Sequence, residues 1–236
     1  MSPSWHALNS AIWTLALALQ IGLAALVLRR GILRTFPAFT ALILFYPLRA
    51  ALLFTLPGRI PSDALEATST VLAVLGLLLQ AWLVVELVAP LMRGRWRGRP
   101  LLARPILVPL AIAAFALVAT WLTLAAIPTR IEVDRTQILF WWIMLALAPA
   151  ALAPAALAPP ALARPPNLSR ICTGFAAFSL CQLVALAGRS HAWLARNRHA
   201  YVAWEYVPAV AYVLVVVAWI AFLKREEPPH PAPLPA

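Results

Sequence analysis

The chain has 236 residues, of which 63% are hydrophobic and only 11% are charged. In a soluble domain roughly a quarter of the residues are charged, and a soluble fold of this length could not bury so much apolar surface. The formal net charge is +11, but its cations, nearly all Arg, lie in short stretches between apolar runs and form no basic domain suited to nucleic acid. With only two Cys as well, composition excludes a soluble globule, a disordered chain and a disulfide-built module, and leaves an integral membrane protein.

Seven apolar stretches are each about 20 residues long, which is the length a helix needs to cross a bilayer. We therefore expect an all-α integral membrane protein, a bundle of about seven transmembrane helices that forms one domain over residues 1–223. A Pro-rich tail follows over residues 224–236. The predicted spans cover residues 8–28, 35–56, 68–92, 106–127, 138–158, 171–188 and 201–223.

The distribution of arginine predicts the orientation of these spans. With the N-terminus outside, the inner stretches hold twelve cations and the outer stretches hold six, as the positive-inside rule requires. The tail is then cytoplasmic. The first span has no basic residue before it and Arg29 and Arg30 directly after it, the reverse of a cleavable signal peptide, so we expect it to be retained.

The membrane itself is also predicted from composition. The chain is rich in Ala, Leu, Pro and Arg and has almost no Lys, which is typical of a GC-rich bacterial genome. We expect a bacterial cytoplasmic (inner) membrane, in which the arginines contact anionic headgroups.

The second span carries a charge inside the bilayer, Arg49, which is costly there without a partner. At the rise of a helix, Arg49 lies about 10 Å below the outer surface, and Glu205 of the seventh span about 6 Å below the same surface. We predict a buried ion pair between the two, with Tyr46 as a further partner. Three roles stay open: a clamp that fixes helix register, a binding or gating element in an outward-facing pocket, or an unpaired Arg49 that reaches the interface.

The third span carries Glu86 close to the inner surface. We predict an interfacial salt bridge to the inner arginines, because a proton relay needs a chain of ionisable groups across the membrane. Three buried amides, Gln20, Gln80 and Gln182, are predicted to bond across helices rather than to hold a ligand.

The fifth and sixth spans have the weakest hydropathy patterns. The fifth contains Pro149, Pro154 and Pro159, and a kinked helix is expected there rather than a missing one. The sixth is barely long enough to span, and small residues recur along it every three or four positions, so that they share one face. Such a stripe indicates close packing within the bundle or, alternatively, a homo-oligomer interface. Its members are Gly174, Ala177, Cys181, Ala185 and Gly188.

The outer link between the sixth and seventh spans, residues 189–199, is basic although it lies outside. It has no acidic residue, so it is predicted either to lie among lipid phosphates or to contact an anionic ligand or an acidic partner. Its two His alone make no metal site. The residues that carry this prediction are Arg189, His191, Arg196, Arg198 and His199.

The seventh span places Glu205, Pro208, Tyr212, Val215 and Trp219 on one stripe at helical spacing. We expect this stripe to face the interior of the bundle. It is therefore the predicted wall of a pocket, should the bundle contain one.

No catalytic motif is present: the sequence has no HExxH, no P-loop, no GxSxG and no Gly-rich dinucleotide fingerprint. The only lysine, Lys224, follows the last span, which excludes retinal, and no pair of histidines lies within the spans to hold a haem. We expect no cofactor, no metal and no enzymatic activity.

Two functions remain. The first is a non-enzymatic subunit, scaffold or sensor that contacts other membrane components, either another membrane protein or a second copy of this chain. The alternative is a small-solute transporter or ligand-binding bundle, with an outward-facing pocket around Arg49 and Glu205.

Overall fold

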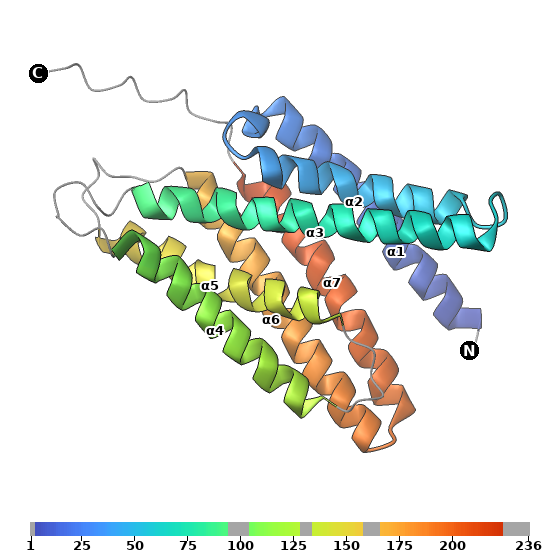
Figure 1. The fold of residues 1–236 in the computed structure, drawn as a ribbon. Coiled ribbons are helices and arrows are strands. Elements are labelled where there is room, and N and C mark those ends of the chain that lie inside the picture. The colour runs from blue at the N-terminus through green and yellow to red at the C-terminus, as the bar shows by residue number, and fades with distance from the viewer. Residues whose placement is uncertain (1–2, 94–103, 128–133, 158–165, 224–236) are drawn as a thin grey trace, which may run out of the picture.

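The computed structural model describes residues 3–93, 104–127, 134–157 and 166–223. In these ranges the chain forms seven α-helices, one short 3-10 helix and no strand (Figure 1), so the all-α prediction is confirmed. The elements are α1 (Pro3–Arg29), η1 (Ile32–Arg34), α2 (Pro37–Thr55), α3 (Ser62–Arg93), α4 (Arg104–Ala126), α5 (Arg135–Leu157), α6 (Pro166–Leu194) and α7 (Arg198–Phe222).

Each predicted span falls on one of these helices. Five of them, α1, α2, α3, α6 and α7, are long and apolar enough to cross a membrane. In α4 and α5 the apolar stretches that can be described are shorter, at Leu110–Ala126 and Arg135–Leu147. The chain is therefore an all-helical protein with several helices suited to a bilayer.

Most helices extend past their predicted spans at one end or both, and the fifth is present as expected. Helix α5 runs unbroken from Arg135 to Leu157, through Pro149 and Pro154. Helix α6 has 29 residues and is longer than the predicted 171–188 at both ends. Pro159 and the tail 224–236 lie outside the described residues.

Helix α6 ends in a tight turn that leads directly into α7. Arg196 has a φ of 52°, the left-handed conformation that usually falls to glycine at a helix end. The amide of Asn197 donates to the Ala192 carbonyl at 2.9 Å and the amide of Arg196 donates to the Trp193 carbonyl at 3.0 Å, which is the Schellman motif. The Asn197 side chain then accepts from the Ala200 amide at 3.0 Å and caps α7. Three hydrogen bonds thus fix the path of the turn.

The buried apolar side chains gather at one end of the bundle, which we call the core end. They come from the end of α1, η1, the start of α2, the end of α3, the middle of α5, the start of α6 and the end of α7, and they include Leu23, Phe39, Leu83, Phe175 and Trp219. Aromatic edges meet there, with the rings of Phe39 and Trp219 5.3 Å apart.

Toward the opposite end, which we call the open end, the helices separate into two groups. Figure 1 shows α2 and α3 diverging from α6 and α7 in this direction. Most side chains of α3 before Gln80 are exposed. Many side chains in the last part of α2 are exposed as well. The α2–α3 turn and the α6–α7 turn both lie at the open end.

Candidate functional site

In each of five helices a polar residue lies next to the apolar core. In every case it stands three positions, about one turn, from a buried core residue, on the side of the open end. The pairs of polar and core residues are Gln20 and Leu23, Tyr46 and Ile43, Gln80 and Leu83, Gln137 and Phe140, and Tyr212 and Val215. We call Gln20, Tyr46, Gln80, Gln137 and Tyr212 the polar layer.

The residues of the polar layer bond to one another across helices. The Gln20 side-chain amide donates to the Tyr212 hydroxyl and joins α1 to α7. Gln80 Nε2 donates to the Tyr46 hydroxyl at 3.1 Å and joins α3 to α2. Gln80 and Gln137 exchange two longer contacts, 3.4 and 3.5 Å, between α3 and α5. The layer therefore joins α1 to α7, α2 to α3 and α3 to α5 at the level where the core ends.

These bonds leave part of the hydrogen-bonding capacity of the layer unused. A phenol hydroxyl can donate as well as accept, and a side-chain amide offers two donor hydrogens and two acceptor lone pairs. The hydroxyls of Tyr46 and Tyr212 each make one hydrogen bond among the described residues, so each keeps a further bonding position. The Gln80–Gln137 contacts are at the limit of bonding distance. The layer therefore keeps donors and acceptors that no described residue satisfies.

Arg49 stands one turn beyond Tyr46 toward the open end. Its guanidinium lies beside α3, where Nη1 is 3.9 Å from the position a Cβ on Gly76 would occupy. It is half-buried, and within the described residues it has no hydrogen bond or ion pair. An intramembrane arginine without a protein partner is a candidate for binding an anion.

Glu205, the predicted partner of Arg49, is exposed on α7. In the part of the chain that the structure describes, no ion pair joins the two side chains. Tyr46 and Tyr212, which the sequence placed near them, bond instead to glutamines of the polar layer.

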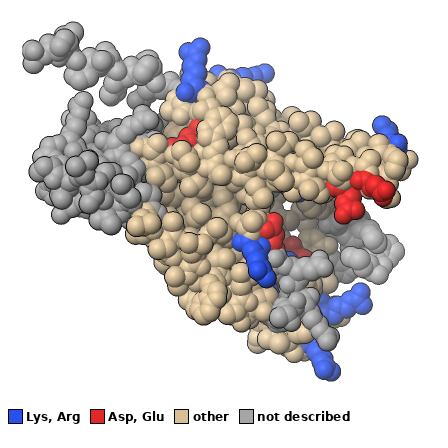
Figure 2. Space-filling view, viewed as in Figure 1, with Lys and Arg blue, Asp and Glu red and all other residues tan. Residues whose placement is uncertain are grey.

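The space between the helix groups is visible on the molecular surface. Figure 2 shows the molecule hollowed between the arm that carries the α2–α3 turn and the body below it, with both acidic and basic side chains at the edge of this hollow. The hollow lies on the open-end side, where the helix groups diverge.

Glu86, the charge of the third predicted span, binds backbone amides and makes no ion pair with an arginine among the described residues. Its carboxylate accepts from the amide of Ala38 at 2.8 Å and from the amide of Phe39 at 2.9 Å. These amides begin α2, whose N-cap residue, Phe36, makes no capping bond with its side chain. Glu86 therefore joins α3 to the start of α2 and stabilises the N-terminus of that helix.

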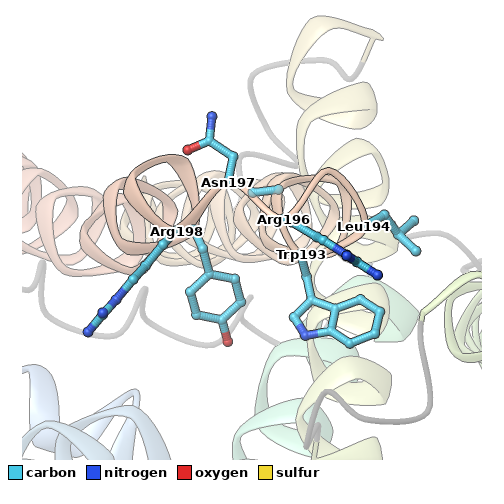
Figure 3. A pocket seen from close by; sticks show the side chains of 7 residues that line it. Trp193, Leu194, Arg196, Asn197 and Arg198 are labelled. Atoms are coloured by element: carbon cyan, nitrogen blue, oxygen red, sulfur yellow. The ribbon is translucent and has the colours of Figure 1, made fainter.

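The basic link forms a second polar feature at the open end. Here a pocket of about 570 Å³ opens at the α6–α7 turn, and Arg196 and Arg198 are among the residues that line it (Figure 3). The other lining residues are Ala192, Trp193, Leu194, Asn197 and Tyr201. We call this the turn pocket.

The remaining predicted residues of the link are not among those that line the pocket. His191 and His199 are exposed. Arg189 is half-buried on α6, and its Nε is buried without a hydrogen-bond partner among the described residues.

The small-residue stripe of α6 divides between two environments. Gly174 lies against Trp219 and Gly188 against Trp204, both on α7, and Ala185 is buried. Cys181 is half-buried, whereas Ala177 is exposed. The two glycines thus serve packing between α6 and α7.

Sequence reasoning missed Gln137, which lies one residue before the predicted fifth span, and the capping role of Glu86. A signal for the second was present. Helix α2 begins at Pro37 after Phe36, with no Ser, Thr, Asp or Asn to cap it, so an acceptor had to come from another helix.

No protein-family model, curated protein or solved structure is significantly similar to this chain.

Proposed function

We propose that this protein is a non-enzymatic multi-pass membrane protein that binds a small polar solute at the polar layer, between its two helix groups. The unused hydrogen-bonding capacity of the layer carries this proposal. A polar group in an apolar bundle is costly unless it is bonded, and the hydroxyls of Tyr46 and Tyr212 each keep one bonding position without a partner in the described residues. A bound solute would supply one.

The proposal includes the orientation of the protein in its membrane. The chain crosses a bacterial inner membrane seven times, with its N-terminus outside, so that the open end and the hollow face outward. The distribution of arginine supports this orientation. A solute then enters from outside and stops at the polar layer, because the core beyond it is packed and apolar.

The side chains around the layer indicate the chemistry of the solute. Phenol hydroxyls and amides suit hydroxyl, carbonyl or amide groups. Arg49, one turn outward and without a protein partner, suits a carboxylate or another small anionic group. We therefore expect a small carboxylate-bearing solute.

The competing hypothesis is a subunit or scaffold that contacts another membrane protein. In that case the layer has only to hold the helices together, and no solute has to bind there. The two hypotheses differ in what a solute does to the stability of the isolated protein.

The test is thermal unfolding of the purified protein in detergent, with and without a panel of small carboxylates, amino acids and sugars. A solute present at a hundred times its Kd stabilises the native state by about 2.7 kcal/mol. We expect a carboxylate to raise the Tm of the wild type. Arg49→Gln and Gln80→Leu should abolish this rise.

Gln182→Leu is the matched control, because Gln182 is a half-buried amide of α6 outside the polar layer. It should keep the stabilisation by the solute. If no compound in the panel shifts the Tm, or if the Gln182 variant loses the shift as completely as the Gln80 variant, the polar layer is not a solute site. A stoichiometric protein partner that co-purifies would then favour the subunit hypothesis.

A further inference from the structure

The turn pocket lies where two spanning helices end. The apolar span of α6 ends at Trp193 and Leu194, and the apolar span of α7 begins at Arg198. Trp, Tyr and Arg at the end of a span are typical of the membrane–water interface, where the aromatic rings lie at headgroup level. A pocket with this lining at this depth faces phospholipid headgroups.

The charge of the pocket is positive among the described residues. Arg196 and Arg198 line it, and none of its lining residues is acidic. Both side chains are exposed, and within the described residues neither makes a hydrogen bond or an ion pair. Figure 2 shows blue and no red at the tip of the molecule that carries this turn, on the face in view. Guanidinium groups bind phosphate through paired N–H donors.

The backbone of the turn is held in shape before any ligand arrives. The Schellman bonds fix Arg196 in its left-handed conformation, and the side chain of Asn197 is occupied in capping α7. Figure 3 shows Asn197 pointing away from the side on which Trp193 and Arg198 project. The two arginines therefore start from a fixed backbone, although their exposed side chains extend in different directions in Figure 3.

The rim of the pocket is apolar. Leu194 is 64% exposed and Trp193 is 39% exposed. Large apolar side chains beside two arginines match a ligand that is charged at one end and apolar at the other. A free inorganic anion would make no favourable contact with the apolar rim.

We propose that the turn pocket binds an anionic phospholipid, with Arg196 and Arg198 on its phosphate and with Trp193 and Leu194 against its glycerol and acyl chains. This proposal is independent of the solute at the polar layer, because the two sites share no residue.

The experiment is native mass spectrometry of the detergent-purified protein titrated with phosphatidylglycerol or with phosphatidylcholine. We expect the wild type to retain phosphatidylglycerol preferentially. The double variant Arg196→Asn, Arg198→Gln should lower its apparent affinity for phosphatidylglycerol roughly tenfold or more. Asn is chosen at position 196 because it tolerates the left-handed backbone, so that the turn keeps its path.

Arg59→Gln is the matched control. Arg59 is an exposed arginine of the α2–α3 turn at the same end of the molecule, and its loss should leave the lipid affinity nearly unchanged. An equal loss in this control would assign the effect to net charge and overturn the proposal. Equal retention of the two lipids by the wild type would do the same, and displacement of the lipid by inorganic phosphate would assign the pocket to a free anion.

Discussion

The first amides of α2 show how a helix can begin without a capping residue of its own. An α-helix leaves four backbone N–H groups at its N-terminus without an intrahelical acceptor. At α2 the amide of Phe36 donates to the Ile32 carbonyl at 2.8 Å, and Pro37 has no N–H. The two that remain, on Ala38 and Phe39, are the two that Glu86 accepts. All four positions are thereby accounted for.

Replacement of Glu86 by Ala should therefore destabilise the protein. Ala38 and Phe39 are fully buried, so their amides would be left without an acceptor, at a cost of about 1–3 kcal/mol each. Glu86→Gln keeps one acceptor oxygen and should lose less. The measurement is equilibrium unfolding in mixed micelles, with Glu66→Ala on an exposed face of α3 as the control. Equal stability of the Glu86→Ala and Glu66→Ala variants would contradict the capping role.

At the scale of single residues the prediction was right for two of three amides and missed their partners, whereas Gln182 makes no hydrogen bond among the described residues. Gln20 and Gln80 were expected to bond across helices, and both do. Depth along each helix was enough for this, because the polar layer lies at one level. Depth gives no information on direction around a helix axis, however, and so it could not tell whether Arg49 and Glu205 face each other.

At the scale of elements, the packing of α6 on α7 depends on two glycines and two tryptophans. A Cβ on Gly174 would lie 2.6 Å from Cε2 of Trp219, and one on Gly188 would lie 2.8 Å from Cε3 of Trp204. Both distances are far below van der Waals contact. Trp219 is buried, and its Nε1 donates to the Arg170 carbonyl of α6 at 3.2 Å. The glycines therefore let each indole lie directly on the neighbouring helix.

We expect Gly174→Ala to destabilise the protein, because the added methyl group displaces Trp219 from its bond to Arg170. Overpacking of this kind costs about 1–3 kcal/mol. Unfolding in mixed micelles measures the loss. Ala177→Val adds volume to the same helix at an exposed position and should be close to neutral. A Gly174 variant as stable as the Ala177 variant would show that the indole moves without cost.

Hydropathy located each helix, because a run of apolar residues and the length of a span are properties of the sequence alone. The end of α6 was misplaced because the prediction stopped the span at the first charge, Arg189. The helix continues for another five residues, with that arginine half-buried on its surface, and it ends only where Arg196 turns left-handed. A helix end set by backbone hydrogen bonds leaves little trace in hydropathy.

At the scale of the whole molecule, the division into a core end and an open end makes the topology testable. If every helix crosses the membrane, then the α2–α3, α4–α5 and α6–α7 connections lie on one side and the α1–α2 connection lies on the other. Neutral, exposed positions report on each without changing the arginine bias. They are Ser62, Ala126 and Ala195 at the open end and Thr35 at the core end.

Single cysteines at these four positions, in a background with Cys172→Ala and Cys181→Ala, would be labelled on intact spheroplasts with a membrane-impermeant maleimide. We expect Ser62→Cys, Ala126→Cys and Ala195→Cys to react from outside, and Thr35→Cys to react only after lysis. The Ala126 probe is decisive for α4 and α5, whose described apolar stretches are short. If α4 and α5 enter and leave the membrane on the inner side, Ala126→Cys reacts only after lysis. Ser62→Cys and Ala195→Cys are then still labelled from outside. Labelling of Ser62 and Thr35 from the same side would rule out a crossing by α2 and with it the seven-span arrangement.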